Sequence, residues 1–122
     1  MSRNGGVCEW CNSNRATNYA HRQRRSQGGT WNPANGVAAC GSGTTGCHGW
    51  ATANPLLARA AGLEVASHED PAEVPVWLWH EFQAGWWLLT FLDDGDPYRS
   101  HVLVPVDAEE WGLPVVPEGA YP

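Results

Sequence analysis

The 122-residue sequence lacks the features of a membrane-bound or secreted protein. No run approaches the roughly 18 apolar residues that a membrane-spanning helix needs. The N-terminal segment "MSRNGGVCEW" also lacks the apolar stretch of a secretory signal. We therefore expect a cytoplasmic protein with no membrane partner.

The first 50 residues have few large apolar side chains and are rich in glycine, asparagine and serine. Such a segment cannot fold by apolar burial alone. A bound metal ion would have to supply much of its folding free energy. The hydrophobic content of the whole chain, 43%, is ordinary for a globular protein of one domain, or of one small domain with an appendage.

Lysine is absent, and the seven arginines are distributed unevenly. Residues 1–62 carry a net charge of +5, and residues 63–122 carry a net charge of −11. This asymmetry predicts that the first part meets a polyanion and the second does not. We expect a zinc-stabilised domain over residues 1–62 and an acidic, tryptophan-rich β appendage over residues 63–122.

The four cysteines form two pairs, Cys8-x2-Cys11 and Cys40-x6-Cys47. Thiols stay reduced in the cytoplasm, so this spacing favours a metal site over disulfides. Four thiolates suit zinc, and a zinc ion closed by four sulfurs has no open position for catalysis. We therefore predict a structural zinc site. The alternative is four unrelated buried thiols.

Local patterns predict a helix and several strands. Asn54 followed by Pro55 is typical of an N-cap and a first helical residue, "LLARAA" continues the helix, and Gly62 ends it. Later, "EVPVWLW", "GWWLLTFL" and "YRSHVLVPV" are typical of strands, with "DDGDP" as a turn, so we expect a β-hairpin. The tryptophans of these strands are expected to pack against the rest of the protein, because the acidic charge around them would repel nucleic acid.

Three segments carry a histidine, an asparagine and a histidine in order: "AHRQRRSQGG" with His21, "NGVAAC" with Asn35, and "CGSGTTGCH" with His48. Together with the four cysteines they resemble the zinc-bearing HNH endonucleases of bacteriophages, over about residues 8–62. The resemblance implies a small α+β fold: a ββα-metal (HNH) unit on a four-cysteine zinc site, followed here by the hairpin-containing appendage.

The resemblance also implies a role for each of these residues. His21 would be the general base at the end of a strand, and Asn35 would fix the loop that orients it. His48, at the start of a helix, would bind a catalytic divalent ion such as Mg²⁺ or Mn²⁺, with Ni²⁺ or Zn²⁺ as further options. The simpler alternatives are a surface histidine for His21, a turn residue for Asn35, and a histidine that supports the zinc site or caps a helix for His48.

The sequence departs from the family pattern at two positions. Many members have a metal-binding histidine or aspartate just before the general base, where this chain has Ala20. Some have another ligand four residues after His48, where this chain has Thr52. A divalent ion would then be held by His48, by water and by the scissile phosphate, and this is compatible with Mg²⁺ because it keeps several waters.

Three arginines, Arg22, Arg24 and Arg25, follow His21 closely. They are expected to bind DNA phosphates on either side of the cut, with an affinity that falls as salt is added. The alternative is a solvated charged loop.

The resemblance, together with the histidines and arginines, leads us to expect a metal-dependent endonuclease that nicks or cuts double-stranded DNA. The resemblance implies a phage protein that acts in the cytoplasm of the infected host. An additional hypothesis links it to genome packaging, with the acidic appendage docking on the phage terminase. The alternative function is a non-catalytic zinc module, derived from an HNH fold, that binds nucleic acid or protein.

Overall fold

The computed structural model describes residues 4–23, 35–42, 44–80, 83–91 and 101–118. They form a small α+β fold with two antiparallel sheets, in agreement with the predicted fold class at this level of detail. None of the helices within these ranges has the length and apolar character needed to cross a membrane. The elements follow in the order β1 (Asn18–His21), β2 (Gly36–Ala39), α1 (Gly46–Ala53), α2 (Pro55–Ala60), the 3₁₀ helix η3 (Pro71–Glu73), β3 (Val76–His80), β4 (Gln83–Phe91), β5 (His101–Pro105) and α3 (Ala108–Trp111).

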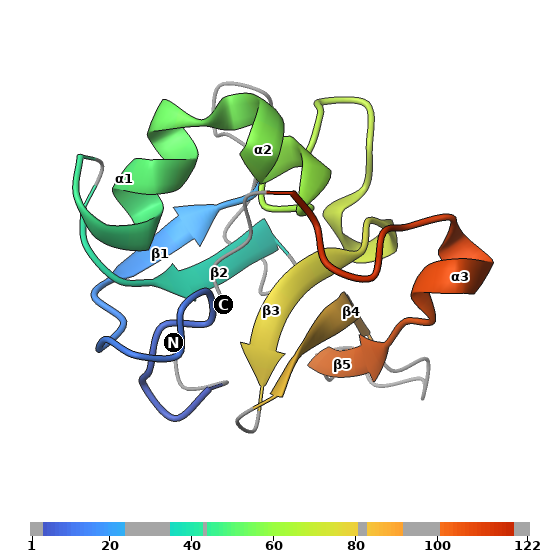
Figure 1. The fold of residues 1–122 in the computed structure, drawn as a ribbon, viewed down its shortest axis with the longest axis horizontal. Helices are drawn as coiled ribbons and strands as arrows, with labels where there is room; N and C mark the ends of the chain where they lie inside the picture. The colour runs from blue at the N-terminus through green and yellow to red at the C-terminus, as the bar shows by residue number, and fades with distance from the viewer. Residues whose placement is uncertain (1–3, 24–34, 43, 81–82, 92–100, 119–122) are drawn as a thin grey trace.

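The first sheet is the antiparallel pair β1–β2, in which Tyr19 lies opposite Ala38 and His21 lies opposite Gly36. Helices α1 and α2 follow β2 directly and lie above the two strands in Figure 1. Asn54 is the C-cap of α1 and the N-cap of α2, and Gly62 directly follows Ala61, the C-cap of the second helix. The predicted helix boundaries at Asn54, Pro55 and Gly62 are therefore confirmed.

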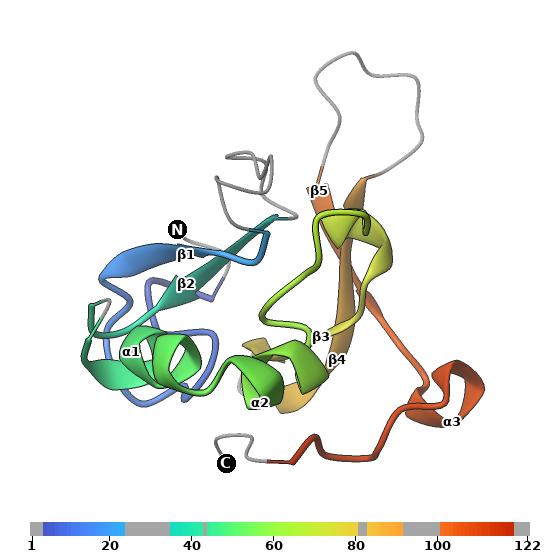
Figure 2. The same cartoon turned by 90° about the horizontal axis from the view of Figure 1, so that it is seen from above.

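The second sheet has the strand order β3-β4-β5 and is antiparallel throughout. Its β4–β5 pair, with Leu89 opposite Leu103, confirms the hairpin expected in the second half of the chain. The predicted turn "DDGDP" lies outside the described residues. Figure 2 shows the two sheets beside each other, with the segment that follows α2 between them.

Glu9 joins the two sheets through its backbone and its side chain. Its N–H donates to the Ala38 carbonyl at 2.8 Å, and its carboxylate accepts from the Ala38 N–H at 2.8 Å. On the other side, the Trp79 N–H donates to the Glu9 carbonyl at 2.7 Å. This buried residue of the first cysteine loop therefore connects β2 to β3.

One hydrophobic cluster contains residues from both halves of the chain. Trp10 and Val37 belong to it from the first half, and Val76, Leu78 and Leu89 belong to it from the second. Trp77 is also buried, where it packs edge-to-face on Trp86, as the packing role predicted for the tryptophans requires. The predicted boundary at residue 62 therefore does not separate two cores. Because residues 1–50 have few large apolar side chains, the sheet β3-β4-β5 supplies a large part of their core.

Candidate functional site: a cysteine cluster beside a histidine-lined cavity

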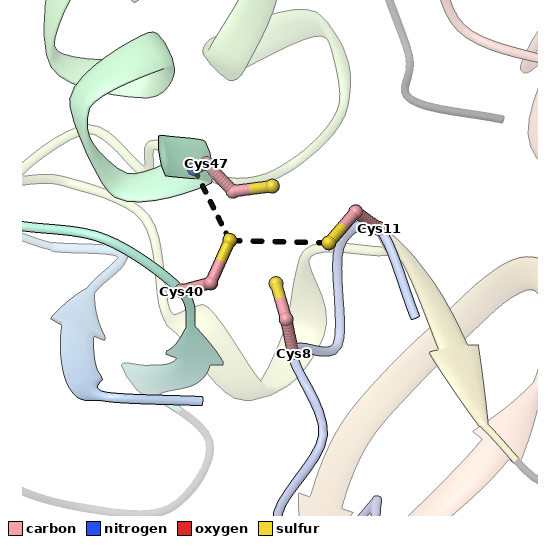
Figure 3. Close-up of side chains that lie close together, drawn as sticks. All are labelled: Cys8, Cys11, Cys40 and Cys47. Atoms are coloured by element: carbon pink, nitrogen blue, oxygen red, sulfur yellow. Dashed lines mark hydrogen bonds between the residues drawn. The ribbon is translucent and has the colours of Figure 1, made fainter. Parts of the chain in front are cut away.

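The four cysteine thiols converge, although they come from three separate segments. Cys8 and Cys11 lie in the N-terminal loop, Cys40 directly follows β2, and Cys47 lies in the first turn of α1 (Figure 3). All four are buried, and their sulfur atoms lie within 4.8 Å of one another. The Cys11 and Cys40 sulfurs are 3.9 Å apart. This separation is close to the roughly 3.8 Å edge of a tetrahedron with 2.3 Å Zn–S bonds.

The six-residue gap between Cys40 and Cys47 is closed by a tight turn. The Ser42 N–H donates to the Thr45 carbonyl at 3.0 Å, and the His48 N–H donates to the Cys40 carbonyl at 3.2 Å. Gly41 and Gly46 both have positive φ, at 86° and 61°, which glycine adopts without steric cost. The two glycines therefore let Cys40 and Cys47 aim at one point despite their separation in sequence.

The closeness of the thiols favours a thiolate in the cluster. The neighbouring Cys47 thiol lowers the pKa of Cys8 to about 5, and Cys8 in turn raises the pKa of Cys47. Burial raises the pKa of Cys11. The form of a cysteine that binds metal is the thiolate. Four convergent, buried sulfurs with a thiolate among them can hold a structural metal ion such as zinc, and they are not four unrelated thiols.

His21 and His48 line the same cavity, which has a volume of about 350 Å³. His21 ends β1, where its ring packs edge-to-face on Tyr19 with 5.1 Å between the ring centroids. His48 is the third residue of α1. Ala20 and Thr52, the two positions at which the chain departs from the HNH pattern, line this cavity as well.

His48 is fixed by its backbone, while its side chain keeps a buried nitrogen available. Its N–H bonds to Cys40, and its carbonyl accepts from the Thr52 hydroxyl at 3.1 Å. Its Nδ1 atom is buried and has no hydrogen-bond partner among the residues that the structure describes. An unsatisfied buried polar atom is costly, and a bound metal ion would remove that cost.

Asn35, directly before β2, bonds to the backbone of Gln23, which closely follows β1. Its side-chain oxygen accepts from the Gln23 N–H at 2.6 Å, and its side-chain nitrogen donates to the Gln23 carbonyl at 3.0 Å. The Asn35 carbonyl also accepts from the Arg22 N–H at 2.8 Å. These bonds hold the two residues that follow His21 against the residue that precedes β2.

The prediction that Arg22 binds DNA is wrong, because its side chain is buried. Its exposed fraction is 0%. The guanidinium donates to the carbonyls of Gly62, Pro71 and Val74, at 2.7 to 2.8 Å. Arg22 therefore connects the segment after α2 to the end of β1 through side-chain hydrogen bonds. Arg24 and Arg25, the other two arginines of the prediction, lie outside the described residues.

Glu64 lines the cavity with the two histidines, and sequence reasoning did not single it out. It lies between Leu63, whose N–H donates to the Ala58 carbonyl, and Val65, whose N–H donates to the Arg22 carbonyl, both at 2.8 Å. Its position depends on contacts between distant segments, so no local spacing marks it as different from the other acidic residues of the second half.

Within the described ranges, the cysteine cluster is the one place where three or more histidine, cysteine, aspartate or glutamate ligand atoms gather closely enough for a metal ion. The cavity has no such compact group. No protein-family model, no curated protein and no solved structure matches the chain. A function is therefore inferred from the geometry of the cluster and the cavity.

Proposed function

We propose that this protein is a metal-dependent endonuclease of the HNH class that hydrolyses phosphodiester bonds of double-stranded DNA. The observation that carries the proposal is that His21 and His48 line one cavity. They come from the first strand and the helix of a β1-β2-α1 unit, which is the order that the HNH resemblance implies. The cysteine cluster joins the end of β2 to the start of α1, so a zinc ion there would fix the helix that carries His48.

His21 is proposed to act as the general base. An imidazole can take a proton from water near neutral pH, and such catalysis contributes roughly 10²–10⁴-fold to a rate. The contact with the Tyr19 ring limits the orientations of the His21 side chain. The bonds between Asn35 and Gln23 hold the chain that follows His21, so Asn35 acts as a positioning residue.

His48 is proposed to hold a divalent ion through its imidazole. His48 fits this role because it lines the cavity and offers an imidazole nitrogen. Its Nδ1 atom is buried and has no hydrogen-bond partner in the described part of the chain. When bound, Mg²⁺ or Mn²⁺ supplies positive charge that stabilises the charge developing on the phosphate and on the leaving oxygen.

Contact with DNA is proposed to depend on phosphate binding by the arginine-rich first half, with Arg24 and Arg25 as the predicted residues. Arg22 contributes to the fold instead. The net charge of −11 over residues 63–122 argues against DNA on that side and leaves it open to a protein partner. A phage terminase, in a packaging role, remains our hypothesis for that partner.

A second candidate function is a non-catalytic zinc module that binds nucleic acid or protein. Two observations favour it: Ala20 stands where many HNH enzymes have a metal ligand, and the described residues gather three or more ligand atoms only in the cysteine cluster. This candidate keeps the cysteine site and assigns no reaction to the cavity.

Relaxation of supercoiled plasmid by the zinc-loaded protein separates the two functions. The assay compares Mg²⁺, Mn²⁺, Ni²⁺ and Zn²⁺ with a reaction that has no added divalent ion. The endonuclease predicts relaxation that depends on the added ion, and it predicts that His48→Ala, purified in parallel, needs a higher ion concentration. DNA binding without relaxation under every condition would favour the zinc module.

A further inference from the structure

Glu64 is the only carboxylate among the described residues that line the histidine cavity. We infer that Glu64 is an oxygen ligand for the catalytic divalent ion, in place of the ligand that the chain lacks at Ala20. The inference rests on the proposed function, because it concerns the ion that His48 is proposed to bind. It assigns a binding role to a residue outside the region of the HNH resemblance.

The backbone around Glu64 is held against the end of β1 on both sides. The Val65 N–H donates to the carbonyl of Arg22, the residue directly after His21. The Arg22 guanidinium donates to Gly62, two residues before Glu64, and to Pro71 and Val74 beyond it. Leu63 and Val65 are both buried, so the segment is anchored by apolar contacts as well. These contacts fix the Glu64 backbone beside the strand that ends in His21.

Glu64 and Ala20 line the same cavity, although they belong to different elements. Ala20 lies in β1 and has no donor atom, whereas Glu64 follows α2 and brings a carboxylate. A carboxylate at either position would add one negative charge and one oxygen donor to the cavity. Glu64 therefore supplies the kind of ligand that the strand position lacks.

The resulting donor set suits the ions that the proposed function requires. Mn²⁺ and Mg²⁺ prefer carboxylate and water oxygens, and Mn²⁺ also accepts imidazole. Mg²⁺ is commonly bound by one or two carboxylates plus substrate phosphates, with several waters retained. His48 and Glu64 as two protein ligands are compatible with that mode. With Glu64 as a second ligand, the ion would not depend on His48 as its only protein ligand.

The direct test is a titration of the full zinc-loaded chain with Mn²⁺ in the absence of DNA. The electron paramagnetic resonance signal of free Mn²⁺ measures how much of the ion is bound. Glu64→Gln removes the charge and keeps the size of the side chain. Glu73→Gln is the matched control, because Glu73 is exposed, lies on the same segment and does not line the cavity. We expect Glu64→Gln to weaken Mn²⁺ binding at least about ten-fold and Glu73→Gln to leave it within about two-fold.

A second measurement does not depend on any variant. In crystals soaked with Mn²⁺, the anomalous signal should place the ion within roughly 2.5 Å of both a Glu64 oxygen and a His48 nitrogen. An ion bound to His48 and remote from Glu64 would overturn the inference. Melting temperature and zinc content of each variant show whether a change in binding reflects loss of the fold.

The outcomes distinguish this inference from the proposed function. Mn²⁺ binding that is lost in His48→Ala but unchanged in Glu64→Gln overturns the role of Glu64 and leaves the endonuclease intact. Binding that depends on Glu64, without plasmid relaxation, supports the ligand and overturns the endonuclease. A wild-type chain that binds no Mn²⁺ in the absence of DNA overturns the role of Glu64, and ion-dependent plasmid relaxation then tests the endonuclease separately.

Discussion

The cysteine cluster and the histidine cavity both take residues from the part of the chain that contains β2 and α1, yet their remaining residues come from different segments. The cluster takes all four ligands from residues 8–47, and their sulfurs converge within 4.8 Å. The cavity takes His21 and His48 from the same region but Leu63 and Glu64 from beyond α2. The first site is thus specified by one half of the chain, and the second is assembled where the two halves meet.

This difference separates structural roles from chemical ones. The cluster has four strong ligands and no open position once a zinc ion is bound, so its loss should remove the fold. The cavity has few ligands and an open volume, so changes there should alter activity and metal binding while the fold remains. Substitutions in the cluster, at the joint between the two halves and in the cavity test this separation.

The largest effect is expected from Cys40→Ser in the cluster. We expect about one zinc per chain in the wild type and none in the variant. We also expect the variant to lose the near-ultraviolet circular dichroism of its packed tryptophans, because structural zinc contributes roughly 10–16 kcal/mol in small zinc domains, which exceeds or matches a typical stability. Trp10, which packs edge-to-face on Trp50 beside the cluster, should report this loss.

Ser42→Ala is the matched control for Cys40→Ser, because Ser42 lies in the same turn and is exposed. It should retain its zinc and its spectrum. A Cys40→Ser protein with unchanged zinc content and melting temperature would show that the cluster is not what holds the first half together.

The next effect concerns the joint between the two halves. Arg22→Ala removes the hydrogen bonds that this buried side chain donates to the carbonyls of residues 62, 71 and 74, so we expect a loss of about 3–5 kcal/mol in the free energy of unfolding. Arg59→Ala, which removes an exposed arginine on α2, should change it by no more than about 0.5 kcal/mol. Urea denaturation of both variants measures the difference.

Equal stabilities for the two arginine variants would contradict the assignment of Arg22 as a structural residue. A large drop in DNA affinity with unchanged stability in Arg22→Ala would restore the role in phosphate binding that the sequence suggested.

The smallest effect is expected from adding the missing ligand in the cavity. Ala20→Asp should lower the Mn²⁺ concentration for half-maximal plasmid relaxation by at least about three-fold, because ligand charge tunes the affinity of a site for a divalent ion. Ala20→Asn, of the same size but neutral, should give a smaller gain. Ala20 packs against the hydrophobic cluster, so both variants should lose some stability. Equal ion requirements in wild type and Ala20→Asp would show that ligand number does not limit the cavity.

Much of the fold could be predicted from local sequence. Asn54 and Pro55 mark the start of α2, and the runs of large apolar residues from Val76 onward mark the strands of the second sheet. The joining of the halves could not be predicted in this way, because it depends on contacts distant in sequence. Glu9 bonds to β2 and β3, and this connection has no signature within its own loop.

The same distinction applies to the two sites. The spacing of Cys8, Cys11, Cys40 and Cys47 was sufficient to predict their convergence, because short loops restrict where a pair of thiols can point. In the sequence, Arg22 lies close to Arg24 and Arg25, and such a group is typical of an exposed charged surface. Its structural role depends on hydrogen bonds to carbonyls between residues 62 and 74, which no local pattern predicts. Glu64 was overlooked because it is one of twelve acidic residues after position 62. In both cases, tertiary contacts determine the role.

The most direct test of the central claim is the single-turnover rate of plasmid cleavage by His21→Ala, measured at saturating divalent ion beside the wild type. We predict a rate lower by roughly 10²-fold or more, because a proton-transfer step loses its base, with zinc content, melting temperature and DNA affinity unchanged. Equal rates for the two proteins would contradict this claim and would leave the cavity without a catalytic role.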